Sequence, residues 1–242
     1  MSFEEIVDEI REYIMYVFFP PYCVICGKHL HFAKWDQRLC AHCEQETPYI
    51  QGDVCEICGK PAIGGTLCEQ CLRKRPVFTK ACAAFVYDDV RKGIARYKYS
   101  GGKVDGDTYG ILMAEYLLQF HKDWIAEMDF ITPVPLHPKK QRKRGFNQSG
   151  ILCEWISEIC DIPYEEDVLQ RTKNTKPQSK LDGKKRESNL KGVFTAQKCK
   201  DKAVLLVDDI FTTGTTANEC SKELYRKGAK EVRIFCLSHT KG

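Results

Sequence analysis

The chain has 242 residues, of which 43% are hydrophobic, 29% charged and 11% aromatic. This composition is that of a globular protein and excludes an intrinsically disordered chain, which would be poorer in aromatic residues. The net charge of +4 excludes a polycation, so any nucleic-acid-binding surface has to be a local patch.

The N-terminal segment predicts a short amphipathic helix. Apolar residues recur every four positions, at Ile6, Ile10, Ile14 and Phe18, and two consecutive prolines follow. We expect this helix to pack on the body of the protein, with docking to a partner as the alternative. Its four early acidic residues argue against a signal peptide, and no apolar run reaches the roughly 18 residues of a membrane span. We therefore expect a cytoplasmic protein, which partners could hold at the inner membrane face.

Eight of the 14 cysteines form four CxxC pairs, and these pairs predict metal binding. They are Cys23/Cys26, Cys40/Cys43, Cys55/Cys58 and Cys68/Cys71. CxxC lets two thiolates reach one ion from a tight turn, and two such turns complete a tetrahedral zinc shell. CVICGK resembles CEICGK, and LCAHC resembles LCEQC, so we expect two similar ribbons over 23–43 and 55–71, with one structural zinc each.

Crossed pairing between the ribbons stays open, and with it a count of one or two ions. A redox role is the weaker interpretation, because that chemistry needs a single CxxC in a thioredoxin-like setting. The six other cysteines have apolar neighbours, and we expect them to be small buried residues. They are Cys82, Cys153, Cys160, Cys199, Cys220 and Cys236.

The composition changes near Pro76, where the cysteine-rich region ends. We therefore divide the chain into an N-terminal helix (1–20), a double zinc ribbon (21–76) and a larger body (77–242). The body alternates predicted strands over 81–87, 129–136, 203–209 and 231–237 with predicted helices over 108–120, 147–160 and 215–228. Alternation of this kind predicts an α/β fold with a mostly parallel sheet flanked by helices.

The stretch AVLLVDDIFTTGTTANEC (203–220) places two acids at the end of a buried strand. Ligands of open α/β sheets bind at this end of the strands. The following threonine-rich turn leads into a helix, whose free N–H groups suit an anion, with a threonine as a plausible cap. Asp208 and Asp209 would repel a phosphate but could accept hydrogen bonds from sugar hydroxyls, directly or through Mg²⁺. The residues thus predict a ribose 5-phosphate site, and solvated acids before an ordinary turn are the alternative.

LLVDDIFTTGTT (205–216) resembles the motif with which type I phosphoribosyltransferases bind phosphoribosyl pyrophosphate (PRPP). The resemblance implies that Asp208 and Asp209 contact the ribose hydroxyls. It implies that the 5-phosphate is held by Thr212, Thr213, Gly214, Thr215 and Thr216.

The segments 131–148 and 169–194 resemble the ComF family, in which a double zinc ribbon precedes a type I phosphoribosyltransferase-like body. The resemblance extends from Cys23 to about Leu237 and implies a role in DNA uptake during natural transformation. RYKYSGGK (96–103) resembles the family's pyrophosphate loop, which would make Lys98, Tyr99 and Gly101 PRPP contacts. An ordinary glycine turn is the alternative for this short segment.

Two basic segments, 137–148 and 171–191, suit single-stranded DNA, with cations on phosphates and Phe146 as a stacking platform. The candidate contacts are Arg142, Lys143, Arg144, Phe146, Lys184, Lys185 and Arg186. In related enzymes a flexible loop at the first segment closes over the substrate and neutralises the leaving pyrophosphate. A solvated charge run is the third interpretation.

Two functions follow. One is an adaptor that binds single-stranded DNA and keeps a PRPP pocket. Because the chain has no GxxxxGK(S/T) motif, its motor would be a partner, which the resemblance identifies as a helicase-like protein of the ComFA type docked on the zinc ribbons. The other function is an active Mg²⁺-dependent phosphoribosyltransferase, for which we name neither acceptor nor catalytic residue. We favour the adaptor.

Overall fold

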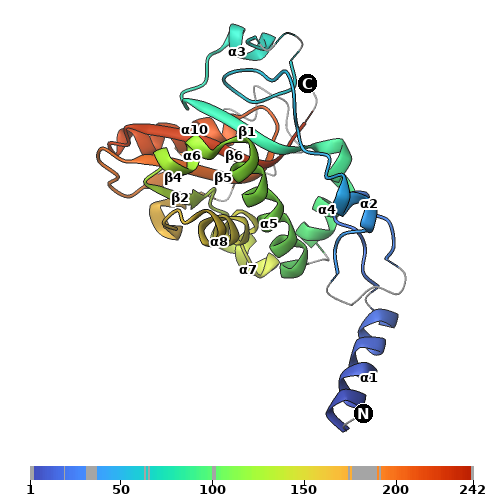
Figure 1. Cartoon of the computed structure of the whole chain (residues 1–242). Helices are drawn as coiled ribbons and strands as arrows, with labels where there is room; N and C mark the ends of the chain where they lie inside the picture. The colour runs from blue at the N-terminus through green and yellow to red at the C-terminus, as the bar shows by residue number, and fades with distance from the viewer. Residues whose placement is uncertain are drawn as a thin grey trace.

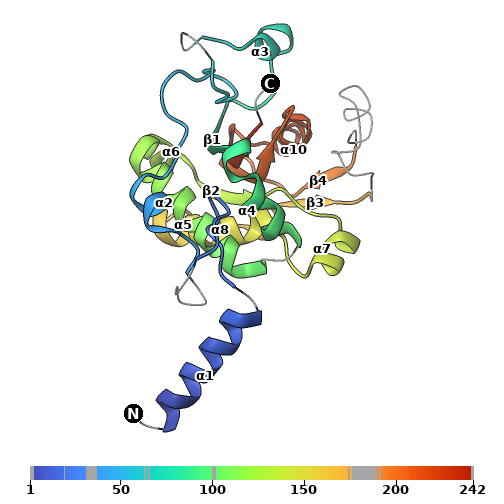
Figure 2. The same ribbon diagram turned by 90° about the vertical axis from the view of Figure 1, so that its right-hand side faces the viewer.

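The computed structural model describes residues 3–18, 20–30, 37–62, 64, 66–99, 102–173, 175, 190 and 192–240. Figure 1 shows a helix at the N-terminus, two loop-rich cysteine modules and a body of helices around one sheet. The modules contain two short helices, α2 (Ala41–Gln45) and α3 (Glu69–Arg73). Each module lies against a different part of the body, the first beside α4 and α5 and the second beside α10 (Figures 1 and 2).

The body is built on a four-stranded sheet of order β1-β6-β5-β2. Its strands are β1 (Lys80–Val86), β2 (Phe130–Pro133), β5 (Ala203–Phe211) and β6 (Glu231–His239). All three pairings are parallel. Residues 204–207 of β5 are fully buried, as expected for a central parallel strand covered on both faces. The α/β fold predicted from the sequence is therefore confirmed.

Helices cover both faces of this sheet. Alternate residues of β5 face opposite cores: Leu205 belongs to the core beneath α4 (Tyr87–Tyr99), α5 (Gly102–Phe120) and α8 (Gln148–Cys160). Leu206 belongs to the core beneath α10 (Thr215–Arg226). Because all the strands of this sheet run parallel, their carboxyl ends meet at one edge, between the two helical layers.

Several short elements were not predicted. They are α6 (Lys122–Glu127), α7 (Pro138–Arg144), the 3₁₀ turn η1 (Glu166–Val168) and the antiparallel pair β3 (Leu169–Arg171) and β4 (Phe194–Ala196). Strand β2 ends at Pro133, three residues earlier than predicted, because Pro133 and Pro135 have no N–H to donate to a ladder.

The N-terminal helix α1 (Phe3–Phe18) forms as predicted, but it does not pack on the body. It projects away from the rest of the chain (Figures 1 and 2). Ile10 is 55% exposed and Phe18 71% exposed. The expectation of packing is therefore wrong. In the described part of the chain, no helix combines the length and the apolar character needed to cross a membrane.

Candidate metal centres and ligand site

The eight paired cysteines form two separate clusters, in each of which the four Sγ atoms lie within 4.8 Å of one another. The first cluster is Cys23, Cys26, Cys40 and Cys43, and the second is Cys55, Cys58, Cys68 and Cys71. The pairing is thus sequential, and crossed pairing is excluded. The other six cysteines are buried, as predicted.

The repeated CxxCGK turn explains why both ribbons carry glycine after the second cysteine. Gly27 and Gly59 have φ values of +72° and +66°, a region that a side chain rarely adopts. A Cβ at Gly59 would also approach the carbonyl oxygen of Ala81 to 2.4 Å. Glycine therefore allows the turn to form and the second ribbon to lie against β1.

The chemistry of each cluster fits zinc. A backbone hydrogen bond from Cys43 lowers the pKa of the Cys40 thiol to about 7, whereas burial raises the pKa of Cys58 to about 12. Four crowded thiols cannot all ionise at neutral pH without a cation, and Zn²⁺ with four thiolates removes that conflict. Two closed sites of this kind would hold the ribbons together.

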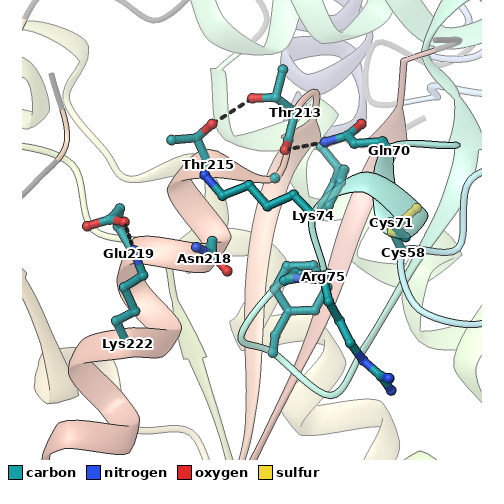
Figure 3. A pocket seen from close by; sticks show the side chains of 14 residues that line it. Cys58, Gln70, Cys71, Lys74, Arg75, Thr213, Thr215, Asn218, Glu219 and Lys222 are labelled. Atoms are coloured by element: carbon teal, nitrogen blue, oxygen red, sulfur yellow. Dashed lines mark hydrogen bonds and ion pairs between the residues drawn. The ribbon is translucent and has the colours of Figure 1, made fainter. Parts of the chain in front are cut away.

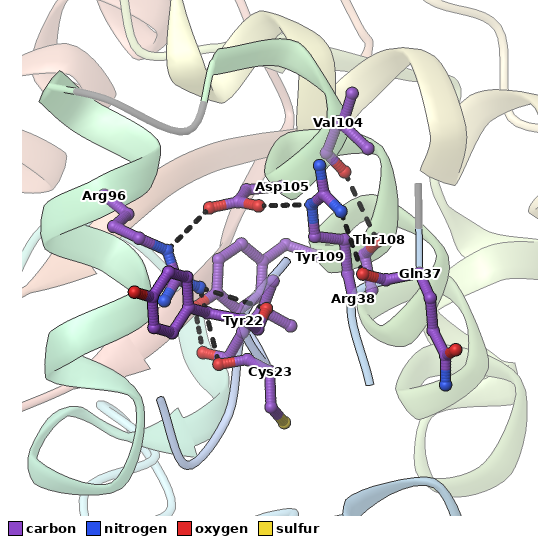
Figure 4. Close-up of polar contacts among 10 residues, drawn as sticks. Tyr22, Cys23, Gln37, Arg38, Arg96, Val104, Asp105, Thr108 and Tyr109 are labelled. Carbon is purple, nitrogen blue, oxygen red and sulfur yellow. Dashed lines mark hydrogen bonds and ion pairs between the residues drawn. The ribbon is translucent and has the colours of Figure 1, made fainter. Parts of the chain in front are cut away.

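The first ribbon is joined to the body by a buried ion-pair network (Figure 4). Asp105 of α5, only 2% exposed, receives Arg38 Nε at 3.0 Å and Arg96 Nε at 3.4 Å. Arg96 also donates to the carbonyl oxygen of Cys23, and Tyr109 Oη donates to that of Val24 at 2.6 Å. The network fixes the end of α4 against the ribbon, two residues before Lys98.

The two acids lie near the carboxyl end of β5, as predicted, although the strand continues two residues further, to Phe211. Asp208 Oδ1 accepts the N–H of Asp209 at 2.8 Å and the hydroxyl of Ser149 at 3.3 Å. Asp209 pairs with Lys98, whose Nζ lies 2.6 Å from Oδ2. Burial, and then the charge of Asp209, raise the pKa of Asp208 to about 7. Without a ligand, Asp208 therefore keeps its proton to a higher pH than an ordinary aspartate does.

Residues 212–216, which we call the phosphate loop, connect β5 to α10. The helix is capped by Gly214, with φ +70° and no side-chain cap, so the predicted threonine cap is wrong. Thr213 and Thr215 instead bond to each other, their Oγ1 atoms 2.8 Å apart. The first N–H groups of α10 have no acceptor within the helix and face the loop. Such a helix start suits an anion.

A cavity of about 290 Å³ joins these parts. Both acids, Thr212 and Thr216 line it together with side chains from other segments, which are Lys98, Tyr99, Lys140, Arg144, Asn147, Gln148, Ser149 and Arg171. A smaller adjoining hollow is lined by residues 210–217 and Asp208. Six of the predicted PRPP contacts thus line one cavity, namely Lys98, Tyr99, Asp208, Asp209, Thr212 and Thr216. Gly101 lies outside the described residues.

Lys140, Arg171 and Ser149 were not predicted to face this cavity. Burial and the charges of Arg171 and Arg144 lower the pKa of Lys140. Arg171 lies over the ring of Phe194, 5.5 Å from its centre, and its Nε is buried without a partner among the described residues. The only available signal for Lys140 and Arg171 was their place in the two basic segments, which we had associated with DNA or, for the first segment, with a loop that closes over the substrate. Ser149 lies just after the first segment and carried no such signal.

The candidate DNA contacts separate into two groups. Arg142 and Lys143 are exposed on α7. Arg144 turns into the cavity, 5.6 Å from the centre of the Tyr99 ring, and Phe146 stacks on buried Tyr97 with ring centres 5.8 Å apart. One face of Phe146 is therefore covered. Residues 138–144 form a helix rather than the flexible loop suggested by related enzymes. Lys184, Lys185 and Arg186 lie outside the described residues.

Comparisons with known proteins agree with this architecture. Residues 14–72 match the double zinc ribbon domain, and residues 155–241 match the phosphoribosyl transferase domain. The chain is 31% identical over 231 residues to Competence protein F of Haemophilus influenzae, covering 91% of this chain and 98% of that protein.

Two other relatives also match along nearly their whole length. DNA utilization protein YhgH of Escherichia coli is 29% identical over 225 residues, covering 91% of this chain and 98% of the relative. Competence protein ComFC of Bacillus subtilis is 26% identical over 235 residues, covering 89% and 93%.

The fold and its two clusters define a protein in which a double zinc ribbon is joined to a phosphoribosyltransferase-type body. The chain belongs to the ComF family.

Proposed function

We propose that this protein serves DNA uptake or DNA utilisation, and that it binds PRPP in the cavity at the carboxyl end of β5. The observation that carries the pocket assignment is the grouping of three kinds of side chain around one cavity. Two acids suit the ribose hydroxyls, a threonine-rich helix start suits the 5-phosphate, and cations from α4, α7 and β3 suit the pyrophosphate. PRPP carries these three groups in one molecule.

The acids also fit a divalent cation. Carboxylate oxygens are the protein ligands that Mg²⁺ prefers, and Mg²⁺ supplied with PRPP would neutralise part of the pyrophosphate charge. Asp209 is paired with Lys98, so the ligand or its cation would have to replace this pair. A ribose hydroxyl donating to Asp208 would favour the ionised carboxylate and lower its pKa.

Calorimetric titration of PRPP, with and without Mg²⁺, tests the pocket. Wild type should bind one PRPP per chain, and the double variant Asp208→Asn/Asp209→Asn should bind about tenfold more weakly or not at all, because each acid accepts charge-assisted hydrogen bonds. Asp201→Asn is the matched control, since this exposed acid precedes β5 at the opposite end of the strand. Equal affinities for wild type and the double variant would remove the ribose assignment.

The DNA role is proposed from the relatives, whose names refer to competence and DNA utilisation, and from exposed cations on α7. Arg142 and Lys143 project from this short helix, which has no acidic residue. The motor would be a helicase-like partner of the ComFA type docked on the zinc ribbons. We place the protein in the cytoplasm, where such a partner could hold it at the membrane.

Anisotropy with labelled single-stranded DNA tests this surface. The double variant Arg142→Gln/Lys143→Gln should weaken binding and flatten the slope of log K against log salt by about 1.4, since each phosphate contact contributes about 0.7. Lys122→Gln/Lys200→Gln makes the same charge change at exposed positions elsewhere. Equal losses in the two variants would indicate a general effect of charge instead of a site on α7.

Phosphoribosyl transfer is the second candidate function. A cavity of about 510 Å³ adjoins the PRPP cavity and shares Pro135, Leu136, Asn147 and Arg171 with it. An acceptor bound there would lie beside the ribose. Release of pyrophosphate from PRPP in the presence of candidate acceptors, including single-stranded DNA ends, would support transfer. Stoichiometric PRPP binding without release supports a sensing or structural role for the pocket.

A further inference from the structure

We infer that the second zinc ribbon holds the phosphate loop in its binding conformation, and that Gln70 is the positioning residue through which it acts. This inference rests on the proposed function, since it takes the 5-phosphate to be the ligand of that loop. It means that zinc binding at the second cluster and the affinity of the phosphate loop for a phosphate ligand are coupled.

Two hydrogen bonds join the ribbon to the loop and to the first turn of α10. Gln70 Nε2 donates to the carbonyl oxygen of Thr213 at 2.8 Å, across 143 residues of sequence (Figure 3). The backbone N–H of Val77, just after the ribbon, donates to Asn218 Oδ1 at 2.7 Å. The ribbon therefore contacts the tip of the phosphate loop, and the residue that directly follows the ribbon contacts the first turn of α10.

The bond to Thr213 determines which way one N–H of the loop points. Because a trans peptide is planar, the carbonyl of Thr213 and the N–H of Gly214 point in opposite directions. Holding that carbonyl toward Gln70 directs the Gly214 N–H away from the ribbon. Gly214 accepts positive and negative φ almost equally, so the loop alone has little preference between this peptide orientation and the flipped one. Gln70 selects one of them.

The position of Gln70 depends in turn on the second cluster. Gln70 lies on α3, between the ligands Cys68 and Cys71. A helix of five residues is too short to be stable by itself, so ligation through Cys68, just before the helix, and Cys71, within it, is what holds the Gln70 amide in place. Cys58, Cys71 and the phosphate loop also line one cavity of about 280 Å³ between ribbon and α10.

Zinc release should therefore free the loop, and the coupling has to be reciprocal. If zinc at the second cluster raises the affinity for a phosphate ligand by some factor, the ligand raises the affinity for zinc by the same factor. A ribbon that only supports the fold would show neither effect once the protein is folded.

The test compares Gln70→Ala with Glu69→Gln. Both residues lie on α3, and Glu69 is exposed and pairs only with Arg73 of the same helix among the described residues. Calorimetry with ribose 5-phosphate should show about fivefold weaker binding for Gln70→Ala, the usual effect of one lost hydrogen bond, while Glu69→Gln binds as wild type does. Elemental analysis should find two zinc ions in all three proteins.

Two further measurements separate positioning from structural support. In the ligand-free protein, hydrogen exchange at residues 212–218 should be faster in Gln70→Ala than in wild type or Glu69→Gln. Ribose 5-phosphate should slow zinc transfer to the chromogenic chelator 4-(2-pyridylazo)resorcinol in wild type, and less so in Gln70→Ala.

The outcomes show whether the proposed PRPP pocket is refuted or only the role of Gln70. If wild type binds neither ribose 5-phosphate nor PRPP, the proposed pocket is refuted and the inference with it. If wild type binds and Gln70→Ala shows the same affinity, exchange rate and zinc transfer, only the role of Gln70 is refuted.

Discussion

Replacing Asp208 by asparagine should stabilise the ligand-free protein while weakening ligand binding. Burial and the neighbouring Asp209 raise the pKa of Asp208 from 3.8 to about 7. The folded state therefore binds more protons than the unfolded state between about pH 4 and pH 7. Stability falls as the pH rises through this window and is flat above it. Such a cost is typical of a site that is prepared for a ligand.

The size of the effect follows from that shift. A carboxyl whose pKa rises from 3.8 to about 7 destabilises the folded state by at most about 4 kcal/mol above pH 7, at 1.36 kcal/mol per pKa unit. About 1.4 kcal/mol of this develops between pH 6 and pH 8. Asparagine keeps an Oδ1 acceptor for the Asp209 N–H and the Ser149 hydroxyl but carries no charge. The variant should therefore be more stable at pH 8 and less dependent on pH.

Urea denaturation followed by tryptophan fluorescence at pH 6 and pH 8 measures both quantities. Staying at or above pH 6 keeps the zinc thiolates deprotonated. Asp129→Asn is a control that should change the free energy of unfolding in the opposite direction. Asp129 accepts the N–H of Ala203 at 2.8 Å, which lowers its pKa, so its loss should destabilise the protein equally at both pH values. An Asp208→Asn protein that is less stable than wild type at pH 8 would refute the reasoning.

Three further predictions concern the ribbons and their contacts. Asp105→Asn leaves two arginines without their buried partner and should cost about 3 kcal/mol in urea denaturation; unchanged stability would contradict the network. Gly93→Ala puts a Cβ 1.9 Å from the carbonyl oxygen of Val24 and should lower the melting temperature sharply, whereas Gly150→Ala, whose Cβ meets nothing closer than 3.5 Å, should leave it nearly unchanged. Cys26→Ser should lower the zinc content from two ions to one by elemental analysis, and loss of both would contradict separate clusters.

The sheet and the metal clusters could be predicted because their signals are local in sequence. The unbroken apolar run before Asp208 is typical of a buried parallel strand, and the CxxC spacing defines which thiols can share one ion. The repeat of CxxCGK favoured sequential pairing, which the two clusters confirm. The buried state of the six other cysteines followed from their apolar neighbours.

Other features depend on tertiary contacts that no short pattern contains. Strands β3 and β4 are three residues each, too short to show a period of two. Arg171 and Arg144 looked like further members of a basic surface, and only the fold turns them into the cavity. The loop before α10 was expected to use a threonine cap, but Thr213 and Thr215 bond to each other and Gly214 takes the cap position.

The prediction that the N-terminal helix packs on the body was wrong for a different reason. Its apolar period predicts the helix but not the surface that covers it. In the described chain α1 leaves that apolar side exposed. A hydrophobic stripe therefore indicates that an element needs a partner without showing that the partner is its own body.

The most direct test of the PRPP pocket is phosphorus NMR of PRPP titrated with protein, because this spectrum reports the 5-phosphate and the pyrophosphate separately. With wild type and Mg²⁺, both sets of resonances should broaden together, and Asp208→Asn/Asp209→Asn should strongly reduce the broadening of both. Broadening of the pyrophosphate alone, to the same extent in wild type and variant, would show binding to basic side chains without use of the ribose and 5-phosphate contacts and would contradict the proposed site.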